Sequence, residues 1–154
     1  MKKFLIVAAA LFALSAFAAD PGLYSPGIST NSFTCPASVD ASSTNSTASN
    51  AILIDKVPLL ERTFRITCSA RGTSTNSSNE VVFVFVGSPD NQTFDSPKTS
   101  INGSMRIRLQ LDGTNLVQSS EYFRMNGWKS VKRAQIENSD ANGLTNIVNT
   151  LSFP

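Results

Sequence analysis

Two strand patterns lie close together in residues 62–87, RTFRITCSARGTSTNSSNEVVFVFVG. Phe64, Ile66 and Cys68 alternate with polar residues, which is the period of a strand with one buried face. Residues 81–86, VVFVFV, are all β-branched or aromatic, and such a short continuous run is typical of a strand covered on both sides. We therefore expect two core strands joined by a polar loop, with Cys68 facing the core.

Further strand patterns fall at residues 33–39, 51–57, 105–111 and 147–153. Residues 112–115, DGTN, have the composition of a hairpin turn, with a returning strand that begins at Leu116. No segment after residue 18 has a convincing helical period, and about seven short strands are typical of an antiparallel sandwich. The predicted fold class is therefore all-β, an antiparallel immunoglobulin-like β-sandwich formed by residues 35–154.

The first 18 residues have the form of a bacterial-type secretory signal peptide. Lys2 and Lys3 precede an apolar run at residues 4–14, and Ala16-Phe17-Ala18 offers small residues at the cleavage positions. The run is shorter than the roughly 20 residues of a membrane span, so we expect cleavage, secretion and no stable membrane insertion. Residues 19–34 contain two prolines and two glycines without alternation, which predicts an extended N-terminal arm.

Cysteine, histidine and charge content restrict the chemistry. The two cysteines are Cys35 and Cys68, and in an exported protein the oxidising compartment favours one disulfide between them. Such a bridge stabilises a fold by roughly 3–4 kcal/mol in the chain-entropy model.

There is no histidine, which excludes His-based triads and most zinc sites. Loss of Lys2 and Lys3 takes the basic residues from 13 to 11, equal to the 11 acidic residues, and a neutral surface argues against nucleic-acid binding.

The polar segments contain one spacing that resembles a metal site. Oxygen ligands at alternate positions before a glycine occur at Asn138, Asp140, Asn142 and Gly143. A calcium loop has this spacing, but Asn149 stands where a bidentate glutamate is required, so we expect a polar turn. The serines lie in low-complexity loops without a G-x-S-x-G elbow. We predict that the protein is not an enzyme and uses no cofactor or metal.

The order of these features resembles that of a chaperone-usher pilus (fimbrial) subunit. A signal peptide and short arm are followed by Cys35 in a first strand, by AILIDKV, and by FRITC ending on Cys68. VVFVFVGSPD and GSMRIRLQLDGTNL continue the likeness, which covers most of the chain after residue 18. The resemblance implies an incomplete immunoglobulin-like fold whose open groove is filled first by a periplasmic chaperone and then by a neighbouring subunit.

From this resemblance we expect a secreted structural subunit of a surface fimbria that polymerises by strand exchange. Its partners would be a periplasmic chaperone and other subunits of the same filament, first in the periplasm and then at the cell surface. Ile147, Leu151 and Phe153 share one face of the last strand pattern, and this strand is the predicted assembly strand. The arm carries Pro21 and Pro26, and proline lacks the N–H that a donated strand needs.

The alternative function is that of a self-contained secreted β-sandwich that binds a carbohydrate or protein ligand through its loops. Trp128 and Tyr122 would be its stacking platform, although core packing is the commoner position for a single tryptophan in a small sandwich. The two hypotheses differ in oligomeric state, because a complete sandwich is a stable monomer and an incomplete one aggregates or polymerises.

Overall fold

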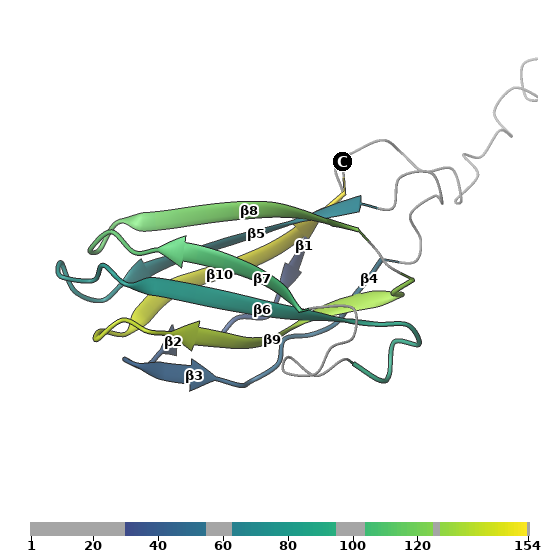
Figure 1. Ribbon diagram of the computed structural model, residues 1–154, viewed down its shortest axis with the longest axis horizontal. Coiled ribbons are helices and arrows are strands. Elements are labelled where there is room, and N and C mark those ends of the chain that lie inside the picture. The colour runs from purple at the N-terminus through teal and green to yellow at the C-terminus, as the bar shows by residue number, and fades with distance from the viewer. Residues whose placement is uncertain (1–29, 55–62, 95–103, 125–126, 154) are drawn as a thin grey trace, which may run out of the picture.

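The computed structural model describes residues 30–54, 63–94, 104–124 and 127–153, and every helix or strand assigned in these ranges is a strand (Figure 1). The strands are β1 (Thr30–Phe33), β2 (Ser38–Val39), β3 (Ser43–Asn45), β4 (Ile52–Leu53), β5 (Thr63–Gly72), β6 (Glu80–Ser88), β7 (Met105–Gln110), β8 (Leu116–Arg124), β9 (Ser130–Asn138) and β10 (Leu144–Ser152). Within the same ranges, no helix is long and apolar enough to cross a membrane. The predicted signal peptide and residues 19–29 of the predicted arm lie outside the described residues.

The strands form two antiparallel sheets that pack as a sandwich, which confirms the predicted all-β class (Figure 1). Sheet A has the order β1-β10-β5-β8, and β2 also pairs with β10. Sheet B has the order β3-β9-β6-β7, and β4 also pairs with β9. The last strand in the sequence, β10, is thus an inner strand of sheet A, with β5 on one edge and β1 and β2 on the other.

Strand β1 lies within the segment 19–34 that the sequence analysis assigns to the arm. Its four residues pair antiparallel with β10, and Phe33 stands opposite Asn149. Phe33 is buried, and its ring centroid lies 5.1 Å from that of Phe85 in β6 of the opposite sheet. The ordered sandwich therefore includes residues before position 35.

Strand β5 has the one-sided burial that its sequence predicts. Phe64, Ile66 and Cys68 are fully buried, while Arg65 and Thr67 between them are half-buried on the outer side. The buried side chains belong to one core cluster that also contains fully buried residues of sheet B, among them Phe83, Ile107 and Ile136. The core thus lies between the two sheets, as expected where alternate residues of each strand face inward.

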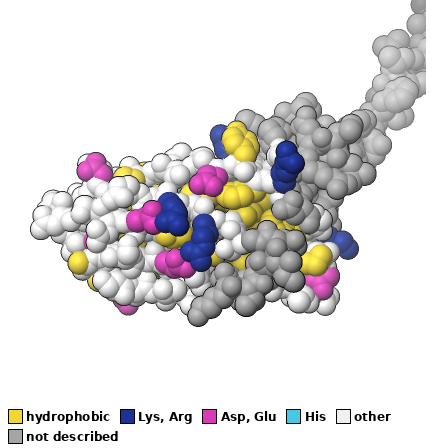
Figure 2. Space-filling model, viewed as in Figure 1, with side chains coloured by type: hydrophobic (Ala, Val, Ile, Leu, Met, Phe, Trp, Pro, Cys, Tyr) yellow, Lys and Arg dark blue, Asp and Glu magenta, His cyan; other side chains and the backbone are white. Residues whose placement is uncertain are grey.

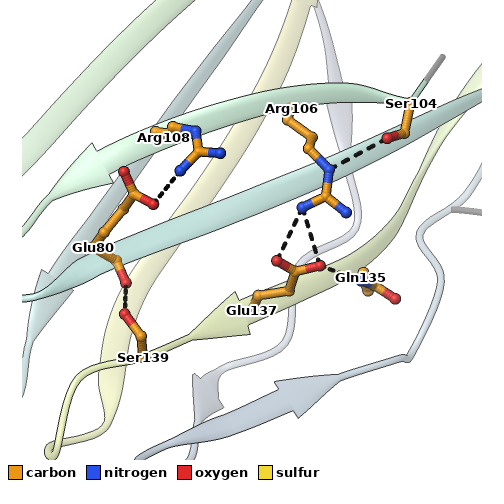
Figure 3. Close-up of polar contacts among 7 residues, drawn as sticks. All are labelled: Glu80, Ser104, Arg106, Arg108, Gln135, Glu137 and Ser139. Atoms are coloured by element: carbon orange, nitrogen blue, oxygen red, sulfur yellow. Dashed lines mark hydrogen bonds and ion pairs between the residues drawn. The ribbon is translucent and has the colours of Figure 1, made fainter. Parts of the chain in front are cut away.

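Strand β6 is buried on both faces, as predicted, but part of its outer cover consists of charged side chains. Val82 and Val84 face outward and are only 8% and 0% exposed. Over β6, β7 and β9, Lys and Arg side chains lie next to Asp and Glu (Figure 2). Arg106 on β7 is opposite Val84, and its Nη1 lies 3.1 Å from Glu137 Oε2 on β9, so this ion pair crosses β6 (Figure 3). The aliphatic stems can cover the valines while the charged ends stay in water.

The predicted hairpin at residues 112–115 is wrong in its strand pairing. The turn itself forms, since the Asn115 N–H donates to the Asp112 carbonyl at 2.9 Å and Gly113 has a φ of 57°. However, β7 pairs with β6 in sheet B and β8 pairs with β5 in sheet A, so the turn carries the chain between sheets. The composition of a turn sets its local backbone geometry, whereas the pairing of its flanking strands depends on how each strand packs against the rest of the domain.

Strand β6 continues through Gly87 to Ser88, two residues beyond the continuous apolar run. Gly87 pairs with Val131 of β9, and the indole ring of Trp128 occupies the space that a Cβ at position 87 would need. Trp128 is thereby packed into the core cluster. The glycine is required here because it permits close approach of the aromatic ring to the strand backbone.

We expect Phe153→Ala to lower the free energy of unfolding by about 3–5 kcal/mol, because Phe153 is buried at the end of β10 and its removal leaves a cavity. Thr150→Ala, on the outer face of the same strand, should cost less than about 1 kcal/mol. Urea unfolding of the two variants measures the difference. Equal unfolding midpoints would contradict a core position for Phe153.

Candidate functional site

The two cysteines are free thiols in the structure, so the predicted disulfide is not formed. Cys35 follows β1 and Cys68 lies in β5, and β10 runs between these two strands. Two strand spacings amount to roughly 10 Å, whereas bridged Cα atoms are at most about 7 Å apart. Burial, with a smaller contribution from the neighbouring Cys35, raises the pKa of the Cys68 thiol, which favours its protonated form in this arrangement.

Cys35 belongs to a polar cluster around Arg133, a residue that is 1% exposed. The Arg133 Nη1 donates to the Thr34 carbonyl at 3.0 Å and to Asn149 Oδ1 at 3.1 Å, and lies 3.2 Å from Cys35 Sγ. Its Nη2 donates to the Thr47 carbonyl at 3.3 Å. The guanidinium therefore joins β9 to β10 and to two loops of the N-terminal segment. Neither ion pair found among the described residues involves Arg133, so its charge is balanced by carbonyl dipoles.

A bulge in β9 explains why this arginine faces the core. Val84 of β6 is opposite Gln135, but the next residue, Phe85, is opposite Arg133, so Ala134 is an extra residue in β9. The extra residue reverses the alternation, which places both Arg133 and Ile136 inside. The sequence analysis missed this site, because a bulge has no reliable signature in a run such as VKRAQIEN.

The calcium-like spacing at residues 138–143 is a polar turn in the structure. Asp140 Oδ2 accepts from the backbone N–H groups of Ser78 and Asn79 at 2.9 Å each, and Oδ1 accepts from the Asn142 N–H at 2.8 Å. Burial by itself would raise the pKa of Asp140, but these hydrogen bonds lower it to about 2. Both carboxylate oxygens are thus used to join the β9–β10 turn to the loop before β6. In the described part of the chain, no group of three or more His, Cys, Asp or Glu residues is placed to hold a metal ion.

The two aromatic residues of the predicted stacking platform do not share a surface. Trp128 is 5% exposed and packs against Gly87, whereas Tyr122 is 64% exposed on β8. The guanidinium carbon of Arg65 lies 5.9 Å from the Tyr122 ring centroid, so the exposed aromatic ring has a cation beside it. A single exposed tyrosine remains available, and it lies on a strand and not on a loop.

The predicted assembly residues Ile147, Leu151 and Phe153 are all buried in the core cluster. All three face inward, as their alternation predicts. The pairing of β10 with β5 is interrupted by a bulge between Thr145 and Val148. The backbone of β10 already pairs along most of its length with strands on both edges. Any role of this strand in assembly would therefore require it to leave its neighbours.

Strand β8 has the most open edge of sheet A. Among the described strands it pairs with β5 alone, along all nine residues. Its inward-facing Val117 and Phe123 are only partly buried, although their neighbours in β5 are fully buried. Figure 1 shows β8 beside β7, which belongs to sheet B and pairs with β6. The sandwich thus has an edge where a further strand could add both hydrogen bonds and apolar contacts.

A scan against protein-family models and a search of curated proteins found no match for this chain.

We expect Arg133→Ala to lower the free energy of unfolding by about 3 kcal/mol or more, because the buried Asn149 side chain and two part-buried carbonyls lose a charged donor. The matched control is Arg108→Ala, which removes an exposed ion pair with Glu80 and should cost less than about 1 kcal/mol. Urea unfolding measures both values. A loss at Arg133 no larger than that at Arg108 would show that the buried cluster does not hold the N-terminal segment in place.

Proposed function

We propose that the protein is a secreted structural subunit of a surface fimbria, with a sandwich of immunoglobulin-like type that assembles by strand pairing between subunits. The open edge of β8 is the observation that carries this proposal. Nine residues of β8 pair on one side only among the described strands, and a long unpaired edge is a template for another chain. Main-chain hydrogen bonds give such strand addition its affinity, and side-chain pockets give it specificity.

The side chains of β8 support the addition of a strand at this edge. Val117 and Phe123 point toward the core but remain partly exposed, so a neighbouring strand would bury more of their apolar surface. Burial of apolar surface contributes roughly 25 cal/mol per Å². The outward residues of β8 are mostly polar, with Gln118 and Ser120 exposed between Leu116 and Tyr122. Val117 and Phe123 thus offer apolar contacts on the inner side, where Ser119 and Glu121 also lie, and the outer side is mostly polar.

The partners follow from this edge and from the signal-peptide pattern at residues 1–18. An open edge in the periplasm risks aggregation, so a periplasmic chaperone would cover it before other subunits of the same filament replace the chaperone. The strand with Ile147, Leu151 and Phe153 already has neighbours on both edges within its own sandwich. It would therefore take part in assembly only by leaving these neighbours and exchanging with the same strand of another subunit. In both contacts the protein acts through its backbone and its core-facing side chains, without catalysis.

The alternative is a self-contained secreted sandwich that binds a carbohydrate or protein ligand. The inner position of β10 favours it, because the strand closes sheet A between β5 and β1 within one chain. A loop site built on both aromatic residues is not supported, since Trp128 is in the core. The alternative therefore needs a ligand surface elsewhere on the molecule.

We also propose the Cys35–Cys68 bridge for the exported protein. Cys35 Sγ lies 3.3 Å from Asn149 Oδ1, and Asn149 also hydrogen-bonds Cys68, so both thiols adjoin one carboxamide. Because β10 lies between β1 and β5, the bridge requires the segment that carries Cys35 to move toward Cys68. The oxidation would release one proton from each thiol and pass two electrons to a thiol oxidant of the export compartment.

If the assembly proposal is correct, the protein without its signal peptide forms larger species as its concentration rises in light-scattering chromatography. Ser119→Lys places a charge on the inner side of the β8 edge and should shift the protein toward monomer. Gln118→Lys, on the outer side of the same strand, should not. A monomer at all concentrations with reversible unfolding would contradict assembly and support the alternative.

Mass spectrometry of unreduced protein isolated from the periplasm tests the bridge. We expect a mass about 2 Da below that of the dithiol form and a linked peptide pair containing Cys35 and Cys68, because thiols are oxidised in that compartment. Cys35→Ser should return the mass to that of a free thiol at Cys68. Two alkylatable thiols in the exported wild-type protein would refute the bridge.

A further inference from the structure

The outer face of sheet A is an array of hydroxyl groups. One row of outward residues crosses four strands, at Ser120, Thr67, Thr150 and Ser32. The next row consists of Tyr122, Arg65, Ser152 and Thr30, of which Ser152 is buried. The hydroxyls of Thr67 and Ser120 lie 2.8 Å apart, which fixes their orientation. Neighbouring strands are about 4.8 Å apart, so these rows present hydroxyl groups at regular intervals.

The exposed Tyr122 and the adjacent Arg65 form the most distinctive feature of this face. The Arg65 Nε donates to Ser152 Oγ at 3.3 Å, and its guanidinium carbon lies 5.9 Å from the Tyr122 ring centroid. Arg65 is therefore held between a hydroxyl and an aromatic ring, and its Nη groups make no hydrogen bond to the described residues. An exposed aromatic ring that is fixed by a cation is a platform on which a sugar ring can stack, since it offers apolar area with little loss of side-chain entropy.

The charge on this face differs from that on the other sheet. Arg65, Arg71 and Arg124 face outward from β5 and β8, and none of the described outward residues of β1, β5, β8 and β10 is acidic. Glu121 of β8 is opposite buried Ile66 and so lies on the inner side of the strand. On sheet B, by contrast, Arg106 and Arg108 are paired with glutamates (Figure 3). Among the described residues, the outer face of sheet A is therefore positive, with no acidic side chain to compensate its arginines.

We propose that the outer face of sheet A binds an acidic polysaccharide, with Tyr122 stacked on a sugar ring and Arg65 paired with a sugar carboxylate. Hydroxyl rows supply donors and acceptors for sugar hydroxyls, and a guanidinium matches the geometry of a carboxylate. A repeating chain ligand suits a repeating array of strand side chains. The site lies on a strand face and not on the loops, and it does not depend on the strand pairing at the β8 edge.

Calorimetric titration of the wild-type protein with alginate, a polyuronate, tests this site, with neutral dextran as the control ligand. We expect binding to alginate and none to dextran. Arg65→Gln and Tyr122→Ala should each weaken binding by about tenfold or more, while Tyr122→Phe should retain most of it. Arg108→Gln is the matched control on sheet B and should leave binding unchanged, and unfolding midpoints confirm that each variant is folded.

Several results would overturn the proposal. One is the absence of alginate binding, and another is an equal loss in Arg65→Gln and Arg108→Gln. Equally tight binding of double-stranded DNA, weakened by the same variants, would show a general preference for polyanions in place of a polysaccharide site. None of these results would change the oligomeric state or its response to Ser119→Lys, so failure of the polysaccharide site is distinguishable from failure of the assembly proposal.

Discussion

Backbone pairing on both edges of β10 holds sheet A together. Without β10, the N-terminal strands β1 and β2 would have no hydrogen-bonded neighbour among the described strands, and β5 would have β8 alone. The inward residues of the strand, including Leu151 and Phe153, complete the core from the same position. The two ends of the described chain are thus joined by one ladder. This pairing brings together segments that are far apart in the sequence. The chain entropy lost in doing so must be offset by the contacts that these segments make.

The buried Arg133 reinforces the same closure from within the sandwich. Its guanidinium contacts the loops that follow β1 and β3, and also Asn149 of β10, so it connects the N-terminal segment to both sheets. Buried charges are costly unless they are well paired, and here two carbonyl oxygens and the Asn149 side chain accept from Nη1 and Nη2, whereas the buried Nε has no partner among the described residues. The bulge in β9 turns Arg133 inward and so makes these contacts possible. The Arg133 cluster thus links these segments by hydrogen bonds.

The two outer faces of the sandwich show how one arrangement of strands can carry different surfaces. On sheet B, ion pairs such as Arg106 with Glu137 bridge the strands and cover the valines of β6. On sheet A, hydroxyl groups and arginines predominate, and Tyr122 is exposed among them. On the first face the two arginines are paired with glutamates, so their charges are compensated. On the second, no acidic residue among the described outward positions compensates the arginines, which is the basis for the proposed ligand.

Local pattern was sufficient to predict strands, buried faces and fold class, because the period of two along a strand is present in the residues themselves. Alternation placed Phe64, Ile66 and Cys68 in the core, and the continuous run at 81–86 indicated a doubly covered strand. The inward position of Ile147 and Leu151 was predictable for the same reason.

Strand order, sheet membership and the candidate sites depended on contacts between distant residues. The turn at 112–115 was predicted, but its flanking strands joined different sheets. The inner position of β10 separates β1, which precedes Cys35, from β5, which contains Cys68. One extra residue in β9 turns Arg133 into the core. The rows that contain Tyr122 and Arg65 also exist only once β8 and β5 are in register. Periodicity along the chain reports which side of a strand is buried, whereas the neighbour of each strand is selected by packing among the strands of the whole domain.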